Sequence, residues 1–189
     1  MPSRDIWSKG GGEKIQDLLG SLLATLIIGD ATITPLYLCS PYLSDFRLLD
    51  NAFGQSSVLF THIPEIAGKG QILFSETLRE LSFRMPVRIV TVRHPSSSAF
   101  VERIISAGEP HITARFAADI YHEKGLLCDA FYVEGSMNFT YSGVYIRDEK
   151  VTCHIAEDAA GRQKIDAAFL EFDRLWKNLG DAKAGGTAE

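Results

Sequence analysis

The stretch that decides the fold is residues 121–149, which reads YHEKGLLCDAFYVEGSMNFTYSGVYIRDE. Six of its positions follow the fixed spacing H-x-K-x4-D-x5-G-S-x-N, and these are His122, Lys124, Asp129, Gly135, Ser136 and Asn138. Residues two apart on a β-strand point to the same face of the sheet. An extended HEK segment therefore presents its imidazole beside its ammonium group, and an extended SMN segment presents its hydroxyl beside its amide.

Pairing these two segments as neighbouring strands would gather four polar groups on one patch. Such a patch suits a phosphate, because charged and amide N–H groups bind phosphate oxygens well. Glu149 lies a short helical turn and a strand downstream of Asn138, so its carboxylate could return to the patch and accept Nδ1–H from a histidine. That hydrogen bond would leave the other ring nitrogen free to attack.

Asp129 is expected to have a structural role. It lies an odd number of residues from His122 and cannot share its face if the strand is unbroken. We place it at the turn 129–130, where an Asp side chain satisfies local backbone N–H groups. We therefore interpret Asp129 as a residue that holds the hairpin and not as a catalytic residue. Gly135 is likewise interpreted as a structural member of the motif.

The motif resembles the H-K-D signature of the phospholipase D superfamily at all six positions. The resemblance implies a histidine nucleophile that forms a phosphohistidine intermediate, phosphoryl-binding lysine and asparagine side chains, and a downstream acid that orients the histidine. By position, these roles fall on His122, on Lys124 with Asn138, and on Glu149, with Ser136 assisting phosphate binding. The family often has asparagine two residues before the acid, whereas this chain has Arg147.

The chain carries one copy of this motif. Of its five histidines, only His122 is followed two residues later by lysine. The family's reaction uses two motifs, because one histidine attacks phosphorus while a second protonates the leaving oxygen. We therefore expect a homodimer whose active site lies at the two-fold interface, the commonest oligomeric symmetry. The alternative is a chain that does not work as an enzyme of this type.

Composition narrows the class of protein. A chain of 189 residues, 46% hydrophobic and 23% charged, fits one ordinary globular domain. A net charge of -5 argues against a generally basic nucleic-acid binder, since loose DNA binding depends on neutralising phosphates. The net charge does not exclude a basic patch on one part of the surface.

Periodicity predicts an α/β fold in a single domain over residues 13–179. Helices are expected at 13–28, 75–85, 96–107 and 158–179, with a turn entering a short helix at 42–49. Strands are expected at 33–40, 57–61, 87–92, 111–116 and 150–155. The strand–helix–strand run 87–116 is typical of a βαβ unit, so we predict a mixed, largely parallel β-sheet flanked by helices.

The two ends are predicted to lie outside this domain, as a flexible arm at 1–12 and a disordered tail at 180–189. The apolar run 18–28 is shorter than the roughly 20 residues that span a bilayer, so no transmembrane segment is predicted. The same run could belong to a signal peptide, but Glu13 and Asp17 lie where the basic end of a signal peptide lacks acids. A cytoplasmic protein is therefore favoured over an exported one.

The sequence contains no clear metal-binding or cofactor-binding motif. Cys39, Cys128 and Cys153 lie in apolar, strand-like runs and are expected to be buried free thiols in a reducing compartment. Cys153 and His154 are adjacent on a predicted strand and point to opposite faces, and no C-x2-C pair exists. We predict neither a metal site nor a cofactor.

The resemblance favours a phosphodiesterase, specifically a metal-independent endonuclease that uses a phosphohistidine intermediate. Small single-motif chains resemble the nuclease branch of the superfamily, which favours nucleic acid over phospholipid as the substrate. Two alternatives stay open. One is a phospholipase, and the other is a catalytically silent nucleic-acid-binding component of a bacterial DNA-modification or defence system.

Overall fold

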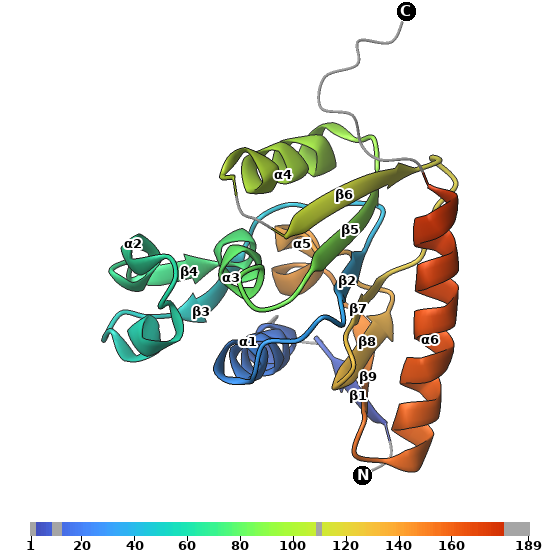
Figure 1. Ribbon diagram of the computed structural model, residues 1–189, viewed down its shortest axis with the longest axis horizontal. Helices are drawn as coiled ribbons and strands as arrows, with labels where there is room; N and C mark the ends of the chain where they lie inside the picture. The colour runs from blue at the N-terminus through green and yellow to red at the C-terminus, as the bar shows by residue number, and fades with distance from the viewer. Residues whose placement is uncertain (1–2, 9–12, 109–110, 180–189) are drawn as a thin grey trace, which may run out of the picture.

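A mixed β-sheet forms the centre of the fold in the computed structural model, which describes residues 3–8, 13–108 and 111–179 (Figure 1). Within these residues the sheet has seven strands in the order β1-β9-β8-β7-β2-β5-β6. Their bounds are β1 (Arg4–Trp7), β2 (Leu36–Cys39), β5 (Val87–Val92), β6 (Ile112–Ala117), β7 (Gly125–Leu127), β8 (Phe131–Gly135) and β9 (Lys150–Ile155).

One side of the sheet is parallel. Strand β2 pairs parallel with β5, and β5 pairs parallel with β6. The crossover from β5 to β6 is α4 (Pro95–Ser106). This helix begins where Pro95 presets the backbone and where the Ser96 N–H donates to the His94 ring, and it buries Phe100 and Ile104 against the core.

The other side of the sheet is antiparallel. Strands β7, β8, β9 and β1 each pair antiparallel with their neighbour, and β7 also pairs antiparallel with β2. A short turn joins β7 to β8, and such a connection permits only antiparallel pairing. The predicted α/β class with a mixed, helix-flanked sheet is confirmed, but parallel pairing is limited to β2, β5 and β6.

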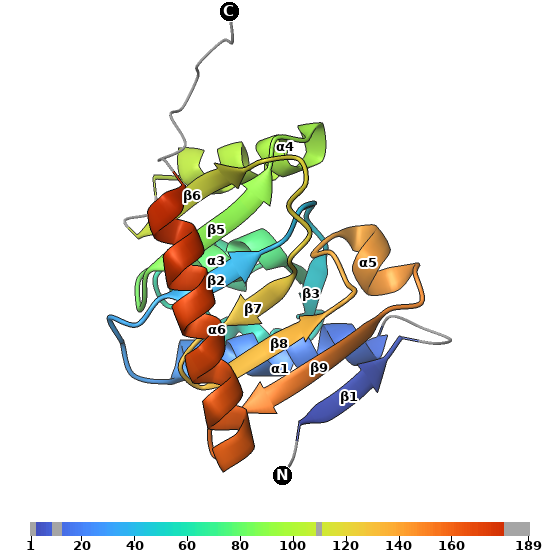
Figure 2. The same ribbon diagram turned by 90° about the vertical axis from the view of Figure 1, so that its right-hand side faces the viewer.

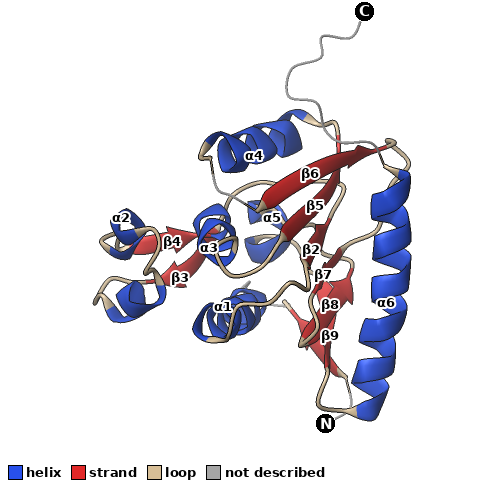
Figure 3. Ribbon diagram, viewed as in Figure 1, coloured by secondary structure: helices blue, strands red, loops and turns tan. Residues whose placement is uncertain are grey.

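Helices cover both faces of the sheet (Figures 1 and 3). Four of them lie on one face, namely α1 (Glu13–Ile28), α3 (Phe74–Leu81), α4 and α5 (Tyr141–Tyr145). The other face is crossed by α6 (Ala159–Asn178), as Figure 2 shows. Its buried stripe, which includes Ile165, Phe172 and Trp176, packs against Tyr37 and Leu127 of the sheet. No described helix is long and apolar enough to cross a membrane.

Two predicted elements were wrong. The run 42–49 is not a turn into a helix, because β3 (Arg47–Asp50) pairs with β4 (Gln71–Leu73) in a separate small sheet. The run 57–61 is not a strand, because Gln55–Leu59 forms a 3-10 helix, η1, ahead of α2 (Pro64–Ala67). A left-handed Gly54 turns the chain there, and the Ser57 hydroxyl donates to the Ala67 carbonyl at 2.8 Å.

The N-terminal arm is also corrected where the structure describes it. Arg4–Trp7 is strand β1, which pairs antiparallel with β9 at the edge of the sheet. Ile6 packs against the core, and Asp5 both pairs with Lys150 at 2.8 Å and accepts a hydrogen bond from Thr152 at 2.6 Å. These contacts are tertiary, so local composition did not reveal the strand. Residues 1–2 and 9–12 and the predicted tail 180–189 lie outside the described residues.

Candidate active site

The predicted site residues gather at one edge of the sheet. This edge holds the carboxyl ends of β2, β5 and β6, the start of β7, the end of β8 and the start of β9. His122 and Lys124 come just before β7, and Ser136 and Asn138 come just after β8. In open α/β sheets, ligands bind outside the carboxyl ends of the strands. Glu149, which directly precedes β9, reaches the same edge.

The HEK and SMN segments are not themselves strands, contrary to prediction. Strand β7 begins only at Gly125, which pairs with Glu134, so the two segments flank the hairpin instead of forming it. Gly125 allows the close packing there, since an added Cβ would lie 2.9 Å from the Tyr132 ring and 3.0 Å from Phe172. The antiparallel register still brings both segments to one place, as the prediction required.

A surface pocket of about 500 Å³ occupies this place. The motif residues that line it are His122, Lys124, Gly135 and Ser136, joined by Lys150. Neither Asn138 nor Glu149 is among the residues that line it. The structure thus brings four of the predicted residues into one pocket and leaves these two beside it.

The side chains of His122 and Lys124 are both at least partly exposed. His122 is exposed, and its ring makes no hydrogen bond within the described part of the chain. Lys124 Nζ donates to the His122 carbonyl at 2.7 Å, which is a neutral partner. Lys150, by contrast, is paired with Asp5 at 2.8 Å. Within the described part of the chain Lys124 is not paired with a carboxylate, so it can bind an incoming anion.

Two acidic side chains share the pocket with these cations. Burial raises the pKa of the Glu123 carboxyl, and the nearby Glu171 and Glu134 carboxylates raise it further. Glu134 also contacts His154, whose Nε2 lies 2.8 Å from Glu134 Oε1. His154 is buried and is not among the residues that line this pocket.

Glu149 is held by Ser136. The Ser136 hydroxyl donates to Glu149 Oε2 and also accepts the Lys150 N–H at 3.2 Å. Glu149 is buried, with only 8% of its surface exposed. Among the described contacts, its carboxylate partner is therefore Ser136 and not the His122 ring that sequence reasoning considered.

Ser8 is a site residue that sequence reasoning missed. Its hydroxyl accepts the Glu149 N–H at 2.7 Å and donates to the Arg147 carbonyl at 2.9 Å. Its own N–H donates to the Glu149 carbonyl at 3.0 Å. Ser8 is 3% exposed, so the end of β1 fixes the backbone that carries Glu149. No local pattern links the two residues, which lie 141 positions apart.

Asn138 is held in place by the Ser40 hydroxyl and by the close packing of α5, and we call these contacts the backbone clamp. The Ser40 hydroxyl lies 3.4 Å from Asn138 Oδ1 and accepts the Phe139 N–H at 3.3 Å. The turn of α5 packs closely beneath, because an added Cβ at Gly143 would lie 2.2 Å from the Asn138 carbonyl oxygen. The Thr140 hydroxyl caps α5 by accepting the Gly143 N–H. The sequence TYSG, a cap residue followed by glycine, was a signal for this tight turn.

Gly135 needs to be glycine for a similar reason. An added Cβ would lie 2.2 Å from the Lys150 carbonyl oxygen, and its φ is +155°. Asp129 lies at the other end of β7, in the turn to β8, where its carbonyl accepts a hydrogen bond from Arg162 at 3.1 Å. Asp129 thus lies in the expected turn and away from the pocket lining, and its contact with Arg162 is made by its carbonyl rather than by its side chain.

The cysteines lie inside the protein. All three are buried and unpaired, as predicted. Burial raises the pKa of the Cys128 and Cys153 thiols to about 11, so both stay protonated at neutral pH. Within the described residues, no group of three or more histidine, cysteine or acidic side chains is arranged to hold a metal ion.

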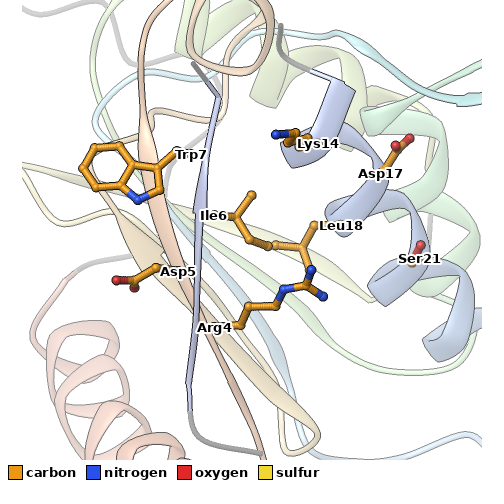
Figure 4. A pocket seen from close by; sticks show the side chains of 8 residues that line it. All are labelled: Arg4, Asp5, Ile6, Trp7, Lys14, Asp17, Leu18 and Ser21. Atoms are coloured by element: carbon orange, nitrogen blue, oxygen red, sulfur yellow. The ribbon is translucent and has the colours of Figure 1, made fainter. Parts of the chain in front are cut away.

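A larger pocket, of about 640 Å³, lies between β1 and α1 (Figure 4). Arg4 and Ile6 point from β1 toward the Leu18 side of α1, whereas Trp7 points to the other side of the strand. None of the six motif residues lines this pocket. Strand β1 links this pocket to the one that the motif residues line. Trp7 of β1 lines the larger pocket, and its ring centre lies 5.4 Å from Nζ of Lys150, which lines the motif pocket.

Comparison with known proteins identifies the fold. No protein-family model and no curated protein sequence matches the chain. Among solved structures, the phospholipase D family member Nuc from Salmonella typhimurium is 16% identical, with a TM-score of 0.59 over 96% of this chain and 98% of Nuc. The chain has the fold of the phospholipase D superfamily. The fold expected from the motif is therefore confirmed.

Other structures share this phospholipase D fold. NucT from Helicobacter pylori is 9% identical, with a TM-score of 0.58 over 95% of this chain and 99% of NucT. Phosphatidylserine synthase from Haemophilus influenzae Rd KW20 is 14% identical, with a TM-score of 0.52 over 96% of this chain but 40% of the synthase. This chain thus matches nearly all of the two small proteins and a part of the larger one.

The site on this phospholipase D fold offers a defined set of groups. It has one exposed imidazole, one available ammonium group, one hydroxyl paired with a buried carboxylate, and one amide clamped beside them. An imidazole can act as a nucleophile or as a proton carrier. The ammonium and amide groups can bind a tetrahedral anion.

Proposed function

We propose that this protein is a metal-independent phosphodiesterase that cleaves nucleic acid as an endonuclease, with one active site shared between two chains. The observation that carries the proposal is the gathering of His122, Lys124 and Ser136 around one pocket, with the backbone clamp on Asn138 beside it. A single exposed imidazole can attack phosphorus, but it cannot also protonate the leaving oxygen on the far side.

The first step forms a phosphohistidine. A neutral ring nitrogen of His122 attacks phosphorus, and the bond from phosphorus to the leaving oxygen breaks as the protonated imidazole of the partner's His122 gives that oxygen a proton. Lys124 and Asn138 stabilise the charge that develops on the non-bridging oxygens. Such preorganised electrostatic stabilisation is often the largest contribution to catalysis.

The second step releases the product. Water attacks the phosphohistidine, and the partner's His122, now neutral, takes a proton from that water. The phosphorus–nitrogen bond breaks, and the first His122 leaves as a neutral imidazole. Each histidine ends in the state in which it began, and the cycle needs neither a metal ion nor a cofactor. The two identical histidines must hold different protonation states at the outset.

The accessible position of the site supports a shared arrangement. His122 is exposed, so a second chain can approach it across a two-fold axis. The structural comparison is compatible with this, since the chain matches nearly the full length of two other small proteins of the same fold. A two-fold axis at the pocket would place both histidines around one phosphorus atom.

The test is hydrolysis in the presence of excess chelator. The substrates are a chromogenic phosphodiester and single-stranded DNA, and solution mass is measured by light scattering on the same sample. We expect a dimer with chelator-resistant activity that falls by several orders of magnitude in His122→Ala. His111→Ala is the matched control, since His111 is exposed at the opposite end of the sheet beside the start of β6. Hydrolysis of phospholipid vesicles alone would identify a phospholipase instead.

A second candidate is a nucleic-acid-binding protein without catalysis. The observation that favours it is the pairing of Glu149 with Ser136, which leaves the His122 ring without a carboxylate partner among the described residues. This candidate predicts tight DNA binding without turnover, unaffected by His122→Ala. The chelator assay and a binding assay on the same variant separate the two candidates.

A further inference from the structure

We propose that a row of exposed rings beside the pocket, formed by Tyr141, Tyr42 and His94, is a stacking surface for unpaired bases of a single-stranded nucleic acid. This inference rests on the proposed function and deepens it, because it selects single strands over duplexes and phospholipids. The three residues belong to α5, to the segment after β2 and to the segment after β5, and Figure 2 shows these elements along the carboxyl edge of the sheet.

The rings next to Asn138 are placed by the same clamp that holds its amide. The Ser44 N–H donates to the Phe139 carbonyl at 3.2 Å, and the Tyr141 N–H donates to the Ser44 hydroxyl at 3.1 Å. The Ser40 hydroxyl joins the Tyr42 carbonyl, at 2.8 Å, to the Asn138 amide. Both tyrosines are therefore anchored through their backbones, next to the predicted phosphate-binding amide.

Their side chains are left exposed. Tyr42 is 42% exposed and Tyr141 is 54% exposed. The Tyr42 ring packs edge-on against His94, with ring centres 5.0 Å apart, and the Tyr141 ring lies 5.2 Å from Tyr145. Each exposed ring is thus supported by a second ring, which restricts its motion and lowers the entropic cost of stacking a base on it.

Arginine side chains lie on both sides of the row of rings. Arg93 is exposed, and its guanidinium lies 4.5 Å from the centre of the Phe116 ring. His94 is its neighbour at the end of β5, and Arg147 is exposed at the other side, beyond α5. Exposed rings and positive groups therefore occur together along this edge of the sheet. Grooves that bind single strands use the same combination, with rings that stack on bases and positive groups that attract the phosphate backbone.

The overall charge makes stacking the main source of affinity. With a net charge of -5, the chain cannot rely on general attraction to phosphates. Bases are available for stacking only when they are unpaired, since a duplex keeps them inside. A bilayer surface offers no planar groups of this kind. The surface thus fits a single strand whose cleaved phosphate lies at Lys124 and whose adjacent bases stack on the tyrosines.

The experiment compares labelled short single-stranded DNA, the matching duplex and an abasic single strand by fluorescence anisotropy. We expect Tyr42→Ala and Tyr141→Ala each to weaken single-strand binding about tenfold and Tyr42→Phe to retain it, since base stacking contributes this much. Binding of the abasic strand and hydrolysis of the chromogenic phosphodiester should stay unchanged. Phe53→Ala is the aromatic control, because Phe53 is 90% exposed in the segment before η1 and away from the pocket lining.

Three results would overturn the inference. The first is single-strand affinity unchanged in both alanine variants. The second is a loss of dimer mass in these variants without a loss of affinity per chain, which would assign the surface to contact between chains. The third is that the two alanine substitutions weaken binding to phospholipid vesicles and leave binding to DNA unchanged. Absence of chromogenic hydrolysis in the wild type would refute the proposed catalysis but not the stacking surface, so the two failures are distinguishable.

Discussion

The Ser136 hydroxyl donates to the carboxylate of Glu149, thirteen residues further along the chain. The same hydroxyl accepts the Lys150 N–H, so the end of β8 and the start of β9 are joined at this serine. A buried carboxylate is thereby fixed next to the pocket that contains His122. Ser136 itself lines this pocket, so the hydroxyl links the carboxylate to the site.

Glu149→Gln should therefore impair the chemical step. Glutamine keeps the size of the side chain and removes its charge, and loss of a group that supports proton transfer typically costs about 10² to 10⁴ in rate. We expect kcat for the chromogenic phosphodiester to fall by about a hundredfold or more, with little change in KM. An unchanged kcat in a folded variant would show that the Ser136–Glu149 pair is only structural.

Ser8→Ala should disturb the same carboxylate from a distance. The substitution leaves the buried Glu149 N–H and Arg147 carbonyl without their partner, which typically costs about 1–3 kcal/mol. We expect a lower free energy of unfolding in urea and a lower kcat. Ser21→Ala, at an exposed serine of α1, is the control and should change stability by less than about 0.5 kcal/mol. Equal effects of the two substitutions would contradict the role of Ser8.

Gly143→Ala should displace Asn138. The added methyl would lie 2.2 Å from the Asn138 carbonyl oxygen, so the backbone must move, at a cost of about 1–3 kcal/mol or more. We expect reduced thermal stability and a raised KM for phosphodiesters. Gly70→Ala is the matched control, since nothing lies within 4 Å of its added methyl. A variant at Gly143 as stable and active as the one at Gly70 would refute the close approach.

The parts of the fold that sequence predicted well depend on local pattern. Strands 87–92 and 150–155 and helix 13–28 were predicted with the bounds that the structure shows. The first strand is rich in β-branched residues, and the helix repeats its buried residues at helical spacing. The motif also predicted that the HEK and SMN segments would lie side by side, and the register of the β7–β8 hairpin between them has this effect.

The parts that failed depend on contacts far apart in sequence. Arg47–Asp50 is a strand only because Gln71–Leu73 pairs with it, and the two segments carry no local sign of each other. Ser8 reaches Glu149 across 141 positions. The bond from Ser136 to Glu149 was missed for a different reason, since the spacing fixed which residues would meet but not which pairs would bond.

The stability of the protein should depend on the protonation of Glu123. Its pKa is raised, chiefly by burial and then by Glu171 and Glu134, so the folded state binds this proton more tightly than the unfolded chain does. The resulting stabilisation is present below the ordinary glutamate pKa and is lost as pH rises through the raised value. Glu123→Gln should therefore have a higher Tm than the wild type at neutral pH, and the difference should shrink toward acid pH. A constant difference across that range would contradict the assignment.

A shared active site makes a quantitative prediction for mixed dimers. Wild-type and His122→Ala chains are co-refolded at varying ratios, and hydrolysis of the chromogenic phosphodiester is measured at constant total chain. If each site needs both imidazoles, only wild-type pairs are active, and an equal mixture should retain about a quarter of the wild-type activity. If each chain works alone, the same mixture should retain about a half. His111→Ala chains in place of the His122 variant should leave the activity unchanged at every ratio, because His111 lies at the other end of the sheet. A linear dependence on the wild-type fraction would therefore exclude the two-chain site while leaving the nucleophilic role of His122 intact.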